Sequence, residues 1–557
     1  MKESFVSSLK SMVAARKVIE LPRLSSRGIR VCHYICYKRN HLSMRTFSPS
    51  LLVILLAIIS LSSCKEKITT PTDHLGQIKF DATGKAEAQP VFTKGMLLLH
   101  SFEYADAAEA FQEVRKIDPD FVMAYWGEAM THNHPLWQEQ DYDTGNEILN
   151  ALAPTPEGRI EKAQTEIEKD FIGGINILYG TGNKATRDSS YAMYMETLYK
   201  KYPGNDEVAS FYSLALNGWG TTDTDKKIME KAAAISYEVL KRNPNHPGAL
   251  HYIIHAYDDP NYAELALATA DKYALVAPDA GHALHMPTHT YLALGMWDKV
   301  VTSNIVSWDA ERARKERKKL DNNALAYHAF HWLEYGRLQQ GDKDNARRMV
   351  DSMQQYCTAL PSPRARAHMI LLKTTYLAET NEYGSDITTI EVDQKDLNIT
   401  TRAKNYFATG MAAYYAKNAG AMDSAILHLA NERVIDDLKS SGTGIRMCGN
   451  INRSLATKTD LLEAETMEME LRAMRAWLDK DAITTEKYFK KATELHAAAG
   501  YSYGPPSIAK PAYEMYGEWL LENNRPKEAL TQFELSLKLA PNKRLSVQGK
   551  EAAMKLL

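Results

Sequence analysis

Residues 95–119 read GMLLLHSFEYADAAEAFQEVRKIDP, and the placement of small, aromatic and helix-breaking residues in this stretch decides the fold. Four of its positions recur with identical spacing near the other end of the chain. The two sets are Gly95, Ala107, Phe111 and Pro119, and Gly517, Ala529, Phe533 and Pro541. Glycine and alanine let two helices approach closely, and proline ends the second helix. The pattern predicts helical hairpins of about 34 residues that repeat along the chain.

This spacing resembles that of the tetratricopeptide repeat superfamily. More narrowly, the chain is similar to a group of bacterial repeat proteins that carry segments such as ALHYIIHAYDDP (249–260) and APDAGHALHMPTHTYLALGMWDKVV (277–301). The resemblance implies an all-α fold, a solenoid of helical hairpins wound as a right-handed superhelix, over residues 90–545. It brings no established activity, so function has to be argued from the residues.

An export signal is predicted ahead of the repeats. Residues 51–61, LLVILLAIISL, form an apolar run that is too short to serve comfortably as a permanent membrane span. The run ends in LSSC (61–64), which resembles the bacterial lipobox, where lipid is attached to the cysteine. We expect a lipoprotein signal peptide at 44–64, lipid on Cys64, and a location in the bacterial cell envelope, at the outer membrane, facing the periplasm or the exterior. The alternative is an ordinary signal peptide with an incidental cysteine.

The other segments are interpreted from their composition. Residues 1–43 are basic and unlike a sequence that normally precedes a signal peptide, so we interpret them as an extension ahead of the true start at Met44. Residues 65–89 are polar and predict a flexible tether, and residues 546–557 predict a helical tail.

Charge and motif content exclude several functions. The chain carries 67 basic and 69 acidic residues, a net charge of −2, so nothing in its overall field favours nucleic acid. The phosphate-binding patterns G-x-x-x-x-G-K-[ST] and G-x-G-x-x-G and the hydrolase pattern G-x-S-x-G do not occur in a strand-to-helix context. Nucleotide-dependent and serine-hydrolase chemistry are therefore not expected.

Histidines recur in the same repeat register. His285 follows His251 by 34 residues, and His289 follows His255 by 34 residues. In this superfamily the corresponding positions face the concave groove where ligands bind. The resemblance therefore predicts a groove rich in histidine and tyrosine, lined by His251, His255, His282, His285, His289, His328, His331 and Tyr335.

The paired spacing also favours a metal site. Two H-x-x-x-H pairs present imidazoles from single helix faces, and imidazole is the commonest metal ligand in proteins. We predict that one zinc or iron ion is bound by ligands drawn from His251, His255, His285, His289 and Asp258. His282, His328 and His331 are predicted to assist them.

Three interpretations stay open on sequence alone. The histidines are structural and bond to tyrosines such as Tyr252, Tyr291 and Tyr327, or they bind a metal ion, or they recognise a polar or anionic ligand without metal. The first function hypothesis is a lipid-anchored repeat protein that binds a protein segment or a small ligand in the groove. The alternative is a metal-binding protein, with room for a metal-dependent activity. The H-E-x-x-H signature of zinc proteases is absent.

Overall fold

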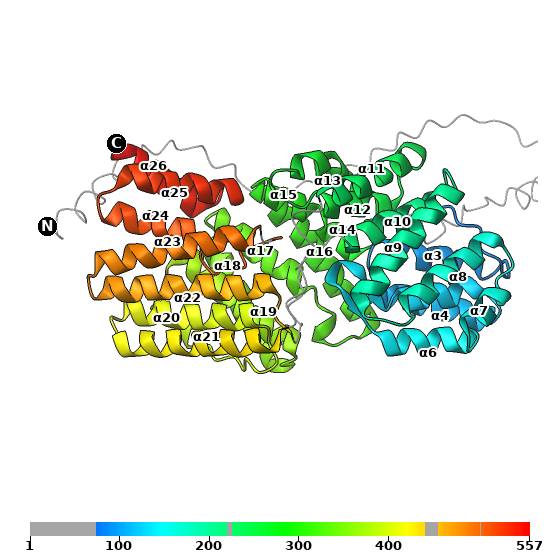
Figure 1. Cartoon of the computed structure of the whole chain (residues 1–557), viewed down its shortest axis with the longest axis horizontal. Coiled ribbons are helices and arrows are strands. Elements are labelled where there is room, and N and C mark those ends of the chain that lie inside the picture. Colours follow the sequence, from blue (N-terminus) through cyan, green and yellow to red (C-terminus); the bar gives the residue numbers. More distant parts are fainter. Residues whose placement is uncertain (1–73, 220–225, 441–454, 502) are drawn as a thin grey trace, which may run out of the picture. The chain divides into compact units, whose positions relative to one another are not determined.

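The computed structural model describes residues 74–219, 226–440, 455–501 and 503–557. Helices dominate these residues (Figure 1). The strands in this part of the chain are two residues long each, β1 (Asn133–His134) paired antiparallel with β2 (Glu139–Gln140). The all-α prediction is confirmed. None of the helices in the described ranges is long and apolar enough to cross a membrane.

Helices follow one another along the chain and pack mainly on their neighbours in sequence. The first group is α3 (Gln89–His100), α4 (Tyr104–Ile117), α5 (Val122–Met130), α6 (Tyr142–Leu152), α7 (Pro156–Lys162), α8 (Glu166–Leu178), α9 (Lys184–Lys201), α10 (Asp206–Trp219) and α11 (Lys226–Arg242), with the 3₁₀ turn η1 (Pro135–Trp137). The middle group is α12 (Pro247–Ala256), α13 (Ala263–Val276), α14 (Gly281–His285), α15 (Pro287–Ala293), α16 (Trp297–Lys318), α17 (Tyr327–Gln339) and α18 (Lys343–Ala359), with η3 (Asn322–Ala324). The last group is α19 (Pro363–Thr380), α20 (Ile399–Tyr415), α21 (Ala419–Lys439), α22 (Lys458–Leu478), α23 (Ala482–Ala499), α24 (Ala512–Glu522), α25 (Pro526–Leu539) and α26 (Arg544–Lys555), with η4 (Asp386–Thr389).

The repeat positions make the contacts that the sequence predicts. A β-carbon placed on Gly95 would lie 2.8 Å from the ring of Phe111, and one placed on Gly517 would lie 2.9 Å from the ring of Phe533. Both phenylalanines are completely buried. The two helices of a hairpin therefore approach closely only because the first helix carries a glycine at this position. The same contact at both ends confirms the hairpin repeat.

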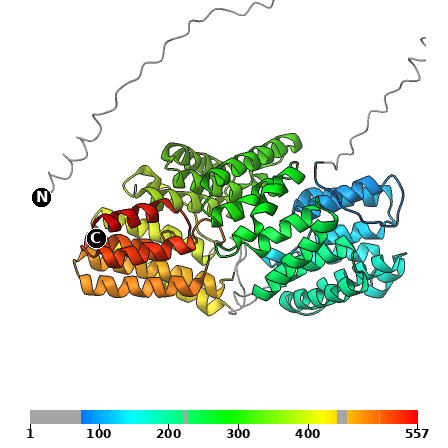
Figure 2. The ribbon, with the colours of Figure 1, turned by 90° about the horizontal axis from the view of Figure 1, so that it is seen from above.

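Helices that are far apart in sequence also meet, and this contact positions the candidate site. α3 packs against α12, as the blue and green helices show in Figure 2. Nδ1 of His251 donates to the carbonyl oxygen of His100 at 2.8 Å. Nearby, Arg314 of α16 donates from Nε to both carboxylate oxygens of Asp106 of α4, at 3.1 Å each. The winding of the repeats thus brings residues near position 100 against the histidine-rich helices.

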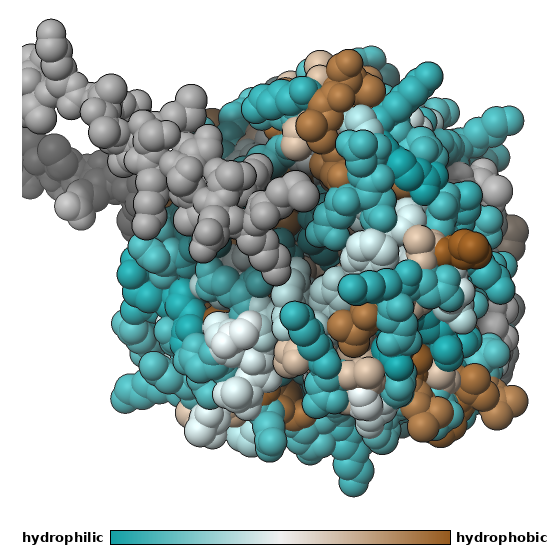
Figure 3. Space-filling view, turned by 90° about the vertical axis from the view of Figure 1, so that its left-hand side faces the viewer, coloured by the Kyte–Doolittle hydropathy of each residue, from teal (hydrophilic) through white to brown (hydrophobic). Residues whose placement is uncertain are grey.

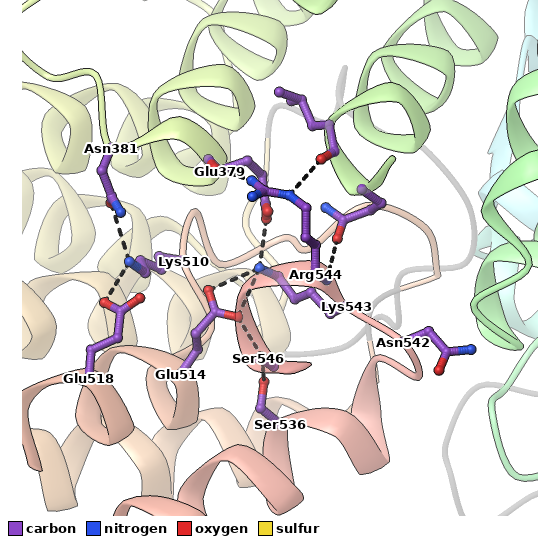
Figure 4. A network of polar contacts seen from close by, with 12 residues as sticks. Glu379, Asn381, Lys510, Glu514, Glu518, Ser536, Asn542, Lys543, Arg544 and Ser546 are labelled. Atoms are coloured by element: carbon purple, nitrogen blue, oxygen red, sulfur yellow. Dashed lines mark hydrogen bonds and ion pairs between the residues drawn. The ribbon is translucent and has the colours of Figure 1, made fainter. Parts of the chain in front are cut away.

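A buried ionic network joins α24 and the start of α26 to α19, the first helix of the last group (Figure 4). Nζ of Lys543 lies 2.7 Å from Glu379 of α19 and 2.9 Å from each carboxylate oxygen of Glu514 of α24. Lys510 pairs with Glu518 at 2.6 Å in the same region. We call these five residues the Lys543 network. Buried charges of both signs meet in it, so it is a structural joint between helices.

The predicted segment boundaries are only partly within the described residues. The extension at 1–43, the signal peptide at 44–64 with Cys64, and the tether up to residue 73 lie outside them. From residue 74 the predicted tether is packed: Leu75 and Ala88 are buried, and the amide of Gln77 donates to the carbonyl of Asn245 at 2.9 Å. The predicted helical tail corresponds to α26, which packs on α25.

The surface seen in Figure 3 is mostly hydrophilic, with apolar residues in separate small groups. Exposed apolar side chains do occur, and the most exposed are Leu275, Leu438 and Ile483. Single exposed apolar residues are ordinary in folded proteins.

Candidate metal centre and adjoining cavity

Six of the predicted histidines form two groups of three. The first triad is His251 and His255 of α12 with His282 of α14, and the second triad is His285 of α14, His289 of α15 and His328 of α17. Within each triad, one ring nitrogen per residue lies within 4.8 Å of the corresponding nitrogens of the other two. The triads adjoin, because the ring centroids of His255 and His289 are 5.8 Å apart.

Two nitrogens of the first triad already have the spacing of metal ligands. Nε2 of His251 lies 3.1 Å from Nε2 of His255. Two nitrogens bound at about 2.0–2.1 Å to one tetrahedral ion would lie roughly 3.3 Å apart. Nδ1 of His251 donates to the carbonyl of His100, so its Nε2 carries a lone pair. Nε2 of His282, the third member, has no hydrogen-bond partner among the described residues.

The second triad has its orientation fixed by neighbouring side chains. Nδ2 of Asn304 donates to the carbonyl of Val300 at 2.9 Å, which leaves its Oδ1 facing Nδ1 of His285 at 2.7 Å. His285 must therefore donate from Nδ1, and its Nε2 carries the lone pair. That Nε2 is buried and has no hydrogen-bond partner in the described part of the chain.

Asp258 plays the same orienting role for His289. Its Oδ2 lies 2.5 Å from Nδ1 of His289, so Nδ1 donates to the carboxylate and fixes the orientation of the ring. A carboxylate that accepts from the far nitrogen of a ligating histidine is the usual outer partner in metal sites. Asp258 thus supports a ligand and does not belong to either triad.

Burial keeps these histidines neutral. It acts with the neighbouring imidazoles to hold the pKa of His251, His255 and His282 well below the usual value. In the second triad, burial and the His289 ring lower the pKa of His285 to about 3. Neutral imidazole is the form that binds a metal ion.

The structure corrects the predicted grouping. His251, His255, His285 and His289 do not form one group of four; His282 and His328, predicted as helpers, each complete a triad. The helix break is the physical reason. α14 ends at His285 and α15 begins at Pro287, so the equal 34-residue register of the two pairs does not become equal geometry.

Two other predicted site residues lie apart from both triads. Nε2 of His331 pairs with the hydroxyl of Thr375 at 2.9 Å. Tyr335 is buried and packs edge-on against Trp297, with ring centroids 5.6 Å apart. Four residues of the predicted groove lie in the interior: His251 and His289 are fully buried, and His255 and His285 are 3% exposed.

The tyrosines do not satisfy the triads in the way that a structural role requires. The hydroxyl of Tyr252 bonds to His100, that of Tyr291 donates to Asp271, and that of Tyr327 has no partner in the described residues. A separate buried group shows what structural histidines look like here. Both ring nitrogens of His100 have partners, Tyr252 at 2.8 Å and Glu207 at 2.7 Å.

A cavity of about 600 Å³ adjoins the triads. His282, His285 and His328 line it, so each triad reaches it through at least one member. Phe102 lies between the first triad and this space, with its ring centroid 4.2 Å from that of His251. The second triad is therefore the more open of the two to a bound molecule.

Charged side chains gather on the cavity wall. Burial and the nearby Glu311 raise the pKa of Glu103 to about 8, although its Oε1 accepts a hydrogen bond from the amide of His282 at 2.8 Å. Burial also raises the pKa of Glu311. Arg314 and Arg364 supply positive charge on the same wall.

Sequence reasoning missed Asn304, Glu103 and Arg364. Glu103 and Asn304 gave no signal, because they reach the site through helix contacts that no local pattern encodes. Arg364 did offer one. It precedes His368 by four residues on α19, the spacing that marked the other pairs, and both line the cavity.

Comparison with known proteins gives fold similarity alone. No family model and no curated protein matches the chain. Yeast Tom70 matches with 12% identity over 84% of this chain and 88% of that chain, at a TM-score of 0.32. The human IFIT1 dimer with m7Gppp-AAAA matches with 13% identity over 78% and 90%, at 0.35, and the TPR domain of P58(IPK) with 12% identity over 85% and 98%, at 0.21.

The chain resembles the tetratricopeptide repeat superfamily. The hairpins and their glycine–phenylalanine contacts carry this statement, since TM-scores this low add nothing to it. Repeat solenoids of this kind are scaffolds whose surfaces bind partners.

Proposed function

We propose that this protein binds two transition-metal ions, one in each histidine triad, beside a cavity that admits a small molecule. One observation carries the proposal: in each triad three imidazoles converge, and one buried nitrogen of each triad, Nε2 of His282 and Nε2 of His285, has no hydrogen-bond partner among the described residues. A buried imidazole nitrogen without a hydrogen-bond partner is costly, and a bound cation would satisfy it.

The donor set favours zinc or copper over iron. Each triad offers three imidazoles and no carboxylate. Three histidines with an open fourth position are a catalytic zinc arrangement, whereas non-haem iron(II) usually takes two histidines and one carboxylate. The carboxylate of Asp258 accepts from Nδ1 of His289, and that of Glu103 accepts from the backbone amide of His282.

The cavity favours a small ligand over a protein segment. Its volume of about 600 Å³ lies within the roughly 300–1,000 Å³ that small-molecule sites occupy. The burial of the predicted groove histidines removes the open histidine surface on which a peptide would lie. In this proposal the protein partners of the repeat scaffold bind at its other surfaces.

Metal analysis of the full-length protein purified without an affinity tag tests the proposal. We expect about two equivalents of zinc or copper per chain. His255→Gln should remove one equivalent and His289→Gln the other, since they belong to different triads. His428→Gln is the matched control, because His428 is exposed and lies on α21.

Two results would contradict metal binding. The first is wild-type protein with well under one equivalent after incubation with either metal. The second is an unchanged metal content in both triad variants, which would make the bound metal adventitious. Loss in only one variant would reduce the proposal to a single site.

We also propose that lipid on Cys64 attaches the protein to the bacterial cell envelope. The support is the apolar run followed by LSSC (61–64) in the sequence. Cys64→Ala should move the protein from the membrane fraction to the soluble fraction, whereas the control Cys357→Ala should leave it in the membrane fraction. A membrane-bound Cys64→Ala variant would remove the lipid anchor from the proposal.

A further inference from the structure

We propose that the cavity binds an aromatic carboxylate, whose carboxylate pairs with Arg364 and whose ring lies against Phe102, Tyr104 and Trp137. This names the ligand class of the cavity in the proposed function and rests on it only in placing the second triad beside the bound molecule. The cavity is lined both by the guanidinium of Arg364 and by aromatic side chains.

Arg364 is the cation of the cavity that lacks an acidic partner. Its Nη1 donates to the carbonyl of Asn323 at 2.6 Å, and its guanidinium lies 5.7 Å from the centroid of the Tyr327 ring. In the described ranges it forms no ion pair within 4.0 Å; the acidic group that acts on it is Glu311, which lies 3.9 Å from Arg314. A half-buried guanidinium with free donors is the side chain best suited to bind a carboxylate through two parallel hydrogen bonds.

The other charges of the wall are already engaged. Glu103 accepts from the amide of His282, and Arg314 is held by Asp106 through both carboxylate oxygens. Glu311 lies 3.9 Å from Arg314, and it packs so closely on Gly281 that a β-carbon there would lie 2.0 Å from its Oε1. A cationic ligand would have to displace these contacts, whereas an anion would find Arg364 available.

Three aromatic side chains, Phe102, Tyr104 and Trp137, line the same cavity. The rings of Phe102 and Tyr104 stack with centroids 5.2 Å apart, and Trp137 lies 5.4 Å from Phe102. The hydroxyl of Tyr104 is buried without a hydrogen-bond partner in the part of the chain that the structure describes. Aromatic side chains gain from stacking on a planar ligand, and the free hydroxyl can bond to a polar ring substituent.

The position of Arg364 also connects the ligand to the second triad. The carbonyl of Arg364 accepts from Nδ1 of His368 at 2.8 Å, one turn along α19. His285, His328 and His368 all line the same cavity as Arg364. A molecule held by its carboxylate at Arg364 therefore lies next to the triad that is more open to the cavity.

Calorimetric titration of the metal-loaded full-length protein tests this with three probes of equal size: phenylacetate, neutral phenylacetamide and cationic phenethylamine. We expect phenylacetate to bind at least about tenfold more tightly than phenylacetamide, because only phenylacetate forms the charge-assisted pair. Arg364→Gln should abolish this difference and Arg364→Lys should restore part of it. Arg312→Gln, which removes an exposed arginine of α16, should leave the difference unchanged.

The metal content of each variant separates the two proposals. Loss of the phenylacetate preference in Arg364→Gln with metal content intact supports the inference. The opposite pattern would overturn the role of Arg364. In it, metal-free wild-type protein loses the preference for phenylacetate, whereas metal-loaded Arg364→Gln keeps it, so the carboxylate binds the metal. Tighter binding of phenethylamine, or no binding of phenylacetate at millimolar concentration, would overturn the ligand class. If the wild-type protein holds no metal but still prefers phenylacetate, and Arg364→Gln loses this preference, only the metal proposal is overturned.

Discussion

The Lys543 network and the histidine triads are both buried polar groups, yet the chain treats them differently. In the network, Nζ of Lys543 lies within 2.9 Å of three carboxylate oxygens from Glu379 and Glu514 (Figure 4). In the triads, three imidazoles converge, and Nε2 of His282 and Nε2 of His285 have no hydrogen-bond partner among the described residues. Polar groups that the chain itself satisfies hold helices together, whereas convergent groups that it leaves unsatisfied indicate a ligand.

Histidine alone does not make this difference. The group formed by His100, Glu207 and His246 is as deeply buried as the triads. In it, Glu207 accepts from both histidines, at 2.7 Å from His100 and 3.1 Å from His246. A carboxylate between the imidazoles does there what a metal ion is proposed to do in the triads.

The largest expected effect is a loss of stability in the Lys543 network, whose charges have partners within the chain. Lys543→Met leaves the buried carboxylates of Glu379 and Glu514 without their cation, so we expect the free energy of unfolding to fall by about 3–5 kcal/mol. Urea denaturation measures it. Lys550→Met, which breaks an exposed pair with Glu534, should cost less than about 1 kcal/mol. Equal effects of the two variants would show that the network is not a structural joint.

Metal removal should give the next largest effect, and only through the triads. Metal at about ten times its dissociation constant stabilises each site by about 1.4 kcal/mol and the two sites together by about 2.8 kcal/mol, so a chelator should lower the melting temperature by a few degrees. This difference in melting temperature between metal-loaded and chelator-treated protein should persist in Lys543→Met. It should disappear when His255 and His289 are both replaced by glutamine. A chelator effect that survives in the double variant would place the metal outside the triads.

A smaller effect tests the outer partner of the second triad. Asp258→Asn keeps the shape of the side chain but weakens its hold on Nδ1 of His289, so we expect affinity for one of the two ions to fall about 10–100-fold. Competition with a chromophoric chelator measures it. Asp259→Asn changes the neighbouring residue, which accepts from Asn261, and should leave both affinities unchanged. Unchanged affinity in Asp258→Asn would show that this bond does not serve a metal ligand.

The fold could be predicted because repeat contacts are local and recur. Gly95 meets Phe111 within one hairpin, and Gly517 meets Phe533 in the same way, so spacing in the sequence became distance in space. The histidines were found for the same reason. Their register placed all six triad members among the predicted residues.

The grouping and the cavity could not be predicted because they depend on distant contacts. The break before Pro287 changes which histidines meet, and the spacing alone does not show how far the two helix segments turn. Glu103 reaches His282 only because α3 and α4 pack near α12 and α16. Burial of the groove positions follows from the same contacts, which fill the concave side that an isolated repeat would expose.

The smallest expected effect concerns the partly exposed ion pair of Arg525 and Glu486, which contrasts with the buried Lys543 network. Its contribution to stability should depend on pH. Hydrogen bonds from Arg525 lower the pKa of Glu486 to about 2, from an unperturbed value of 4.5. A carboxyl whose pKa is lowered by folding stabilises the protein fully above pH 4.5, and this contribution is lost as the pH falls towards 2. Because the pair is partly exposed, we expect Glu486→Gln to cost less than about 1 kcal/mol at pH 7.

The cost of Glu486→Gln should shrink steadily below pH 4.5. The control Glu494→Gln, which removes only a 3.9 Å contact with Lys491, should have little effect at pH 7. Urea unfolding between pH 3.5 and 8 measures both variants, and a cost of Glu486→Gln that grows on acidification would contradict the sign of this argument.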